Sequence, residues 1–141
     1  MTLSALLFDV DGTLADTEET HRQAFNAAFL EFRLPYEWSP DQYEVLLNVS
    51  GGKERLAHFF EGLPASREER ARLLANVSGL HRVKTERYAE LVASGGSPLR
   101  PGVARLIEEA LAAGIRVGIA STTTSANVAA LLDAELGRNA H

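Results

Sequence analysis

Two short apolar runs interrupt an otherwise helical pattern. Residues 5–8 and 115–120 are short, apolar and bounded by turn-forming residues, which is typical of buried strands in a parallel sheet. Elsewhere, apolar residues recur at helical spacing, most clearly over residues 17–33. Helices are predicted over residues 17–33, from 40 to a loop at 48–52, and over 53–61, 66–92, 103–113 and 126–136.

Local signals mark where several of these helices begin or break. Ser39 is the expected N-cap of the second helix, with Pro40 in its first position and Gln42 completing a capping box. Gly79 is expected to break the long helical segment. Ser125 is expected to cap the last helix.

The order of the elements predicts an α/β core interrupted by a helical insertion. A strand comes first, helices fill residues 16–94, and a Gly- and Ser-rich linker leads into a second helix–strand–helix run. We therefore expect a core formed by residues 1–15 and 95–141 and an all-helical domain formed by residues 16–94.

Composition narrows the classes of function. The chain has no cysteine, which excludes disulfides and thiol catalysis. Its net charge is −5 without a run of Lys or Arg, which argues against nucleic acid and anionic membranes as partners. No apolar segment approaches membrane-spanning length, and no basic segment precedes the first apolar run. We therefore expect a cytoplasmic protein.

The first apolar run leads into two aspartates, Asp9 and Asp11, followed by Gly12 and Thr13. Residues two apart in extended chain point the same way, so the two carboxylates repel unless a cation or a shared proton intervenes. One carboxylate can attack or bind metal while the other transfers a proton. Gly12 permits the sharp exit from the strand. The alternative is an Asp-rich turn that binds no metal.

The second apolar run ends at Ser121 in a hydroxyl-rich turn. A hydroxyl and the amide that follows it, here that of Thr122, form a small anion cradle at a strand-to-helix turn. The alternative is that the Ser and Thr residues only cap the following helix.

These features together resemble the haloacid dehalogenase superfamily. The stretch from Asp9 through Leu14 after an apolar strand matches its first signature, and Ser121 at the end of a later strand matches its second. The helical insert resembles a type-1 cap. Residues 18–26, 51–56 and 119–124 further resemble the branch containing β-phosphoglucomutase and the CbbY-type sugar-bisphosphate phosphatases, most closely the latter.

The resemblance implies a partial Rossmann-like core of parallel strands with helices, and a chemistry for its residues. Asp9 takes the phosphoryl group and Asp11 protonates the leaving oxygen, then activates the water that hydrolyses the aspartyl-phosphate. The Asp9 carboxylate and the Asp11 main-chain carbonyl hold Mg²⁺. Gly12 and Thr13 complete the loop, and Ser121 and Thr122 bind phosphate. The implied substrate is a small phosphorylated sugar.

Further substrate-binding candidates lie in the helical insert. Glu18 and His21 are three residues apart and therefore share a helix face. Lys53 follows two glycines and can reach a phosphate as the cap closes, and Arg55 is a further candidate. The alternatives are a solvated Lys and a structural or surface His.

Two superfamily signatures are not found before His141: a Lys, and an acidic pair that completes the Mg²⁺ site. We therefore expect a chain with a whole cap and about half a core, which alone binds Mg²⁺ poorly and turns over little. The family implies a monomer, and the unfinished sheet implies self-association. A β-phosphoglucomutase-like isomerase and a catalytically inactive fragment remain as alternatives.

Overall fold

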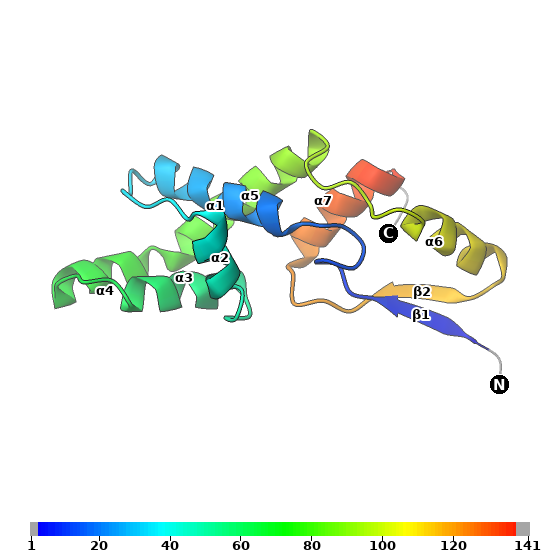
Figure 1. The fold of residues 1–141 in the computed structure, drawn as a ribbon, viewed down its shortest axis with the longest axis horizontal. Coiled ribbons are helices and arrows are strands. Elements are labelled where there is room, and N and C mark those ends of the chain that lie inside the picture. Colours follow the sequence, from blue (N-terminus) through cyan, green and yellow to red (C-terminus); the bar gives the residue numbers. More distant parts are fainter. Residues whose placement is uncertain (1–2, 138–141) are drawn as a thin grey trace. The chain divides into compact units, whose positions relative to one another are not determined.

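The computed structural model describes residues 3–137 (Figure 1). Two strands, β1 (Ala5–Phe8) and β2 (Arg116–Ile119), lie side by side as a parallel pair. The helices are α1 (Glu18–Glu31), α2 (Pro40–Leu46), α3 (Gly52–Glu61), α4 (Arg67–Ala75), α5 (Val77–Ala93), α6 (Val103–Ala112) and α7 (Ser125–Leu136). The predicted α/β class with parallel strands and helices is confirmed.

The strands are less buried than their apolar sequences predicted. Leu6 and Phe8 are half-buried, whereas Leu7, which points to the opposite face of the sheet, is 75% exposed. Phe8 pairs with Ile119, the last residue of β2. The prediction of buried strands is wrong for one face, because the sheet of the described residues has two strands and one covered side.

The chain divides into two compact units. One unit contains the chain up to Thr20 and from Ala89 onwards, and the other contains His21–Tyr88. Both boundaries fall inside helices, α1 and α5. The first unit holds the two strands with α6 and α7, and the second holds α2, α3 and α4. The predicted boundaries near residues 15 and 94 stay a prediction.

The helical unit has an aromatic core centred on Trp38, which is fully buried. The rings of Phe25 and Phe29 lie 4.8 and 5.0 Å from its ring. The Asn26 side chain accepts from the Trp38 amide (2.8 Å) and donates to the Trp38 carbonyl (3.0 Å). The loop after α1 is therefore fixed by packing and by a paired amide contact at one residue.

The predicted start of α2 is confirmed, because the Ser39 hydroxyl accepts from the Gln42 amide at 3.2 Å. The break in the long helical segment falls at Asn76, not at Gly79 as predicted. Gly79 lies inside α5, where an added Cβ would stand 3.1 Å from the Phe32 ring. Gly79 therefore allows close helix packing instead of a break.

No helix in the described part of the chain is long and apolar enough to cross a membrane.

Candidate active site

The ends of β1 and β2 bring the two predicted signatures to one edge of the sheet. The Ala120 amide donates to the carbonyl of Phe8, the last residue of β1, at 2.9 Å, which extends the ladder by one bond past the end of β2. Asp9 follows Phe8 and Ser121 follows Ala120. The carboxyl edge of a parallel sheet is where α/β proteins bind ligands.

The loop after β1 turns sharply around the buried residue Val10. Its carbonyl accepts from the amides of Thr13 (3.2 Å) and Leu14 (3.0 Å), and Gly12 has a φ of 77°. That positive φ favours glycine at this turn. Asp9 is exposed, and no hydrogen bond or ion pair engages its carboxylate within residues 3–137. Its oxygens therefore face solvent beside the turn.

Two hydroxyls engage the Asp11 carboxylate. Thr17 donates to Oδ1 and Thr123 donates to Oδ2. Thr17 is fully buried just before α1, and Thr123 lies in the loop after β2. The orientation of Asp11 therefore depends on both loops that leave the sheet.

The loop after β2 carries the second signature. The Ser121 hydroxyl accepts from the Thr123 amide at 3.2 Å, and Thr122 is exposed. The helix cap is Thr124, whose side chain accepts from the Asn127 amide, so the predicted cap Ser125 is wrong. The helix begins one residue earlier than predicted, which makes Ser125 its first residue.

A hollow of about 450 Å³ lies against this loop and the start of α7. Its lining combines hydroxyls with small apolar groups: Ile119, Ser121, Thr123, Ser125, Val128 and Ala129.

Arg100 and Glu18 surround Gly12. The Arg100 guanidinium donates to the Gly12 carbonyl, and the Arg100 amide donates to the Leu14 carbonyl at 2.8 Å. A Cβ added at Gly12 would stand 3.8 Å from the Glu18 carboxylate. The turn that follows Asp11 is therefore held from the segment before α6 and lies beside an acidic side chain.

The helical unit buries a Lys–His pair. The Lys84 Nζ lies 2.7 Å from the His21 Nδ1, and both residues are buried. The His21 ring stacks on Tyr88 at 4.2 Å, and the Lys84 ammonium lies 5.1 Å from the centre of the Phe25 ring. Because a Lys ammonium only donates, the Nδ1 of His21 is the acceptor of this contact.

A second buried histidine lies one helical turn from Lys84 on α5. Burial, together with the charges of Lys84 and Lys53, lowers the pKa of His81 from 6.5 to about 4. A Cβ added at Gly52 would stand 2.6 Å from the His81 Nε2. The start of α3, where Lys53 is exposed, therefore packs directly against His81.

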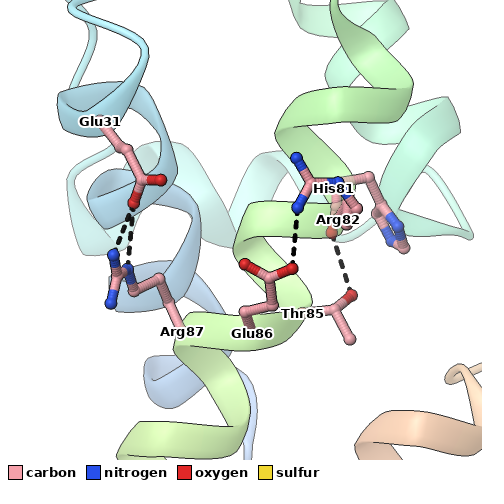
Figure 2. A network of polar contacts seen from close by, with 6 residues as sticks. All are labelled: Glu31, His81, Arg82, Thr85, Glu86 and Arg87. Carbon is pink, nitrogen blue, oxygen red and sulfur yellow. Dashed lines mark hydrogen bonds and ion pairs between the residues drawn. The ribbon is translucent and has the colours of Figure 1, made fainter.

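The outer face of α5 fixes it to α1. Figure 2 shows Arg87 reaching Glu31 on α1, with Nη2 and Oε2 2.6 Å apart, while Arg82 pairs with Glu86 along the helix. The Thr85 hydroxyl donates to the His81 carbonyl at 3.0 Å (Figure 2). The first contact links α1 to the helix that carries Lys84 and His81, and the other two lie within that helix.

A family model described as haloacid dehalogenase-like hydrolase matches residues 3–141. The chain belongs to this family. It is 52% identical to the plasmid protein CbbY of Cupriavidus necator, across 96% of this chain and 53% of that protein. It is 50% identical to CbbY of Rhodobacter capsulatus, across 99% of this chain and 60% of that protein.

The fold comparison agrees. The crystal structure of CbbY from Rhodobacter sphaeroides in complex with phosphate matches with a TM-score of 0.85 and 45% identity, across 96% of this chain and 58% of that one. An aspartate-to-asparagine mutant of that protein in complex with xylulose-(1,5)bisphosphate matches equally well. The chain therefore spans little more than half the length of these haloacid dehalogenase relatives.

Most of the predicted site residues lie in the loops that follow the two strands or at the start of α1. Asp9, Asp11, Gly12, Thr13, Glu18, Ser121 and Thr122 all lie in the loops after β1 and β2 or at the start of α1. His21, Lys53 and Arg55 lie in the helical unit. Arg55 uses its guanidinium to donate to the carbonyls of Leu46 (3.0 Å) and Val49 (3.0 Å), which anchors the end of α2. Its predicted role in substrate binding stays a prediction.

The available donors suit Mg²⁺ in kind. The Asp9 carboxylate is exposed, and hard cations of this size prefer carboxylate and carbonyl oxygens together with water. Within residues 3–137, no three His, Cys, Asp or Glu side chains form a group that could hold a metal. The Gly12 carbonyl is already used by Arg100. The fit therefore rests on the Asp9 carboxylate and the Asp11 main-chain oxygen.

Sequence reasoning missed four residues that shape this geometry: Thr17, Thr123, Arg100 and Lys84. Thr17 precedes a helix, where a threonine is typical as a cap, so its contact with Asp11 carries no local signal. Arg100 is 88 residues from Gly12, and Lys84 is 63 residues from His21. Such contacts depend on the packed fold, although Thr123 stands in the turn that the second signature marked.

Proposed function

We propose that this chain belongs to a phosphatase that hydrolyses a small phosphorylated sugar, in the class of sugar bisphosphates, through a phosphoryl-aspartate at Asp9. The observation that carries the proposal is the pairing of an exposed Asp9 with Asp11, whose carboxylate two hydroxyls engage. Ser121 leaves the neighbouring strand at the same edge.

The proposed reaction has two steps: the phosphoryl group is transferred first to Asp9 and then to water. An Asp9 carboxylate oxygen forms a bond to phosphorus while the bond from phosphorus to the sugar oxygen breaks, and Asp11 gives that oxygen its proton. Water then attacks the phosphorus, Asp11 takes a proton from that water, and the Asp9–phosphoryl bond breaks. Free phosphate leaves, and both aspartates return to their starting states.

The phosphoryl group needs local positive charge, because the chain is acidic overall. We assign the Ser121 hydroxyl and the Thr122 amide as hydrogen-bond donors to its oxygens. We assign Mg²⁺ to the Asp9 carboxylate and the Asp11 carbonyl. When bound, such an ion offsets the repulsion between Asp9 and the phosphoryl group.

The rest of the substrate is assigned to the helical insert of residues 16–94. This insert contains the basic residues Lys53, Lys84 and His21. The charges of both lysines act on His81. The crystal structure of the CbbY mutant from Rhodobacter sphaeroides contains xylulose-(1,5)bisphosphate, which supports a sugar bisphosphate as the substrate of this chain. The relative described as a putative β-phosphoglucomutase is 21% identical and supports the fold alone.

Phosphate release from a panel of sugar mono- and bisphosphates with Mg²⁺ tests the proposal, with xylulose-1,5-bisphosphate included. We expect low release, which Asp9→Asn abolishes and which is greatest for a bisphosphate. Isomerised sugar phosphate without free phosphate would indicate the mutase instead. No release from folded chain would overturn the proposal for this chain and would indicate a fragment that is inactive alone.

A further inference from the structure

We propose that Thr123 is a positioning residue that aligns the Asp11 carboxylate with the phosphoryl-binding Ser121. This inference rests on the proposed function, which assigns proton transfer to Asp11 and phosphoryl binding to Ser121. Nothing in the signatures themselves gives Thr123 a part in the reaction.

Thr123 bonds to both residues at once, through different atoms. Its hydroxyl donates to the Asp11 Oδ2, and its amide donates to the Ser121 Oγ at 3.2 Å. It is half-buried and lines the hollow beside the loop. One residue therefore links the group that transfers a proton to the group that holds phosphate.

The hydrogen bonds of Thr123 leave Asp11 able to transfer a proton and Ser121 able to bind the phosphoryl group. Ser121 Oγ accepts from the Thr123 amide, so its own hydroxyl proton remains free to point at a phosphoryl oxygen. A carboxylate oxygen has two lone-pair sites, so Oδ2 can accept from Thr123 and still exchange a proton with substrate or water. Thr123 therefore orients Asp11 without occupying the position that the reaction uses.

The Asp11 carboxylate is held by hydroxyls from both loops that leave the sheet edge. Thr17 engages Oδ1 from the loop after β1, while Thr123 engages Oδ2 from the loop after β2. Loss of the Thr123 bond removes the contact from the loop after β2 to Oδ2, which is expected to change the orientation of the carboxylate. A displacement of about 1 Å in a catalytic group can cost about 100-fold in rate.

A purely structural role is separable, because the helix cap belongs to Thr124. Removal of the Thr123 hydroxyl leaves the α7 cap intact. Thr123→Val keeps the shape of the side chain and removes the donor, while Thr123→Ser keeps the donor and removes a methyl group. Thr85→Val is the matched control, since the Thr85 hydroxyl donates to a main-chain carbonyl within α5.

The first readout is the ¹³C resonance of the Asp11 carboxyl at neutral pH in the full chain without substrate. We expect Thr123→Val to shift it, and Thr123→Ser and Thr85→Val to leave it near its original position. The second is phosphate release, in which we expect Thr123→Val to lower kcat by about 10- to 100-fold. We expect KM to change little and Thr123→Ser to restore most of kcat.

An unchanged Asp11 resonance in Thr123→Val overturns the proposal, and so does a loss of kcat that Thr123→Ser fails to restore. If the unmodified chain releases no phosphate from any sugar phosphate, the proposed function fails. The resonance then decides by itself whether Thr123 holds Asp11. Circular dichroism of each variant checks that its total helix content is unchanged.

Discussion

The ammonium of Lys84 lies 2.7 Å from the Nδ1 of His21 inside the helical unit, although 63 residues separate them in the chain. Both side chains are buried, and the cation lies over the Phe25 and Tyr88 rings at 5.1 and 5.2 Å. A buried ammonium is stabilised only by partners that accept its protons or present a ring face. The pair therefore joins α1 to α5 inside the helical unit.

His21→Phe is expected to lower the free energy of unfolding by about 1–3 kcal/mol, because it removes the acceptor of a buried hydrogen bond. The phenyl ring can keep the stack on Tyr88, so the loss reports the polar contacts of the imidazole, which include the Nδ1 contact. Urea denaturation measures the change. His58→Phe, at an exposed position on α3, is the control and is expected to alter stability little. Equal effects of the two substitutions would contradict the assignment.

His81 is expected to make stability depend on pH. Its pKa is about 4 in the folded chain, lowered mainly by burial and then by Lys84 and Lys53, against 6.5 for an ordinary imidazole. Between these values the unfolded chain binds a proton that the folded chain does not. Stability is therefore fully present above about pH 6.5 and falls as the pH drops towards 4.

Urea midpoints between pH 7.5 and 4 measure this loss. His81→Gln is expected to flatten the dependence in that window, because the side chain no longer titrates. His58→Gln removes an exposed imidazole and is expected to keep the slope of the unmodified chain. A slope that survives His81→Gln would show that other groups cause it.

Gly52→Ala is expected to destabilise the helical unit. The added Cβ would stand 2.6 Å from the Nε2 and 2.8 Å from the Cδ2 of His81, so the buried ring must move. Overpacking of this kind costs about 1–3 kcal/mol. Gly62→Ala is the control, because the nearest atoms to its Cβ are 3.6 Å away. If thermal denaturation gives the two variants the same stability, the close approach at Gly52 is wrong.

Arg100→Met is expected to loosen the turn after Asp11 without unfolding the chain. The side-chain bond to the Gly12 carbonyl is lost, whereas the main-chain bond from Arg100 to Leu14 remains. Exposed charges contribute about 1 kcal/mol or less to stability. Hydrogen exchange should therefore quicken at the Thr13 and Leu14 amides while the urea midpoint moves little. Arg105→Met, on exposed α6, should leave both amides unchanged.

Much of the local structure could be predicted, because its signals lie within a few residues. Ser39 is the N-cap of α2, as expected for a serine followed by a proline in the first helical position. Residues 5–8 form a strand, as expected for a short apolar run that ends at a turn. The fold class was also predicted from the order of the elements, and the family from signatures that are each a short stretch of sequence. The roles of Asp9, Asp11 and Ser121 in the reaction stay predictions.

Contacts between distant segments could not be predicted. Gly79 was expected to break a helix because glycine is a poor helix former, yet the ring of Phe32 packs where its side chain would be. Thr17 was expected only as part of a helix, yet its hydroxyl donates to Asp11. In each case the role of the residue depends on its contact with another segment, which the neighbouring sequence does not indicate.

The exposure of Leu7 gives a last prediction. A leucine in an apolar strand is expected in a core, but Leu7 is 75% exposed, whereas Leu14 in the following turn is 1% exposed. Leu7→Gln is therefore expected to change the free energy of unfolding by within about 0.5 kcal/mol. Leu14→Ala is expected to lower it by about 2–5 kcal/mol, because it leaves a cavity.

Urea denaturation of both variants measures these changes, with light scattering to follow association. A large loss of stability in Leu7→Gln would mean that the side chain is covered in solution, since removal of apolar surface from water is what stabilises a leucine. Its dependence on protein concentration then identifies the cover: a loss that grows with concentration indicates a second copy, and a constant loss indicates a contact within the chain.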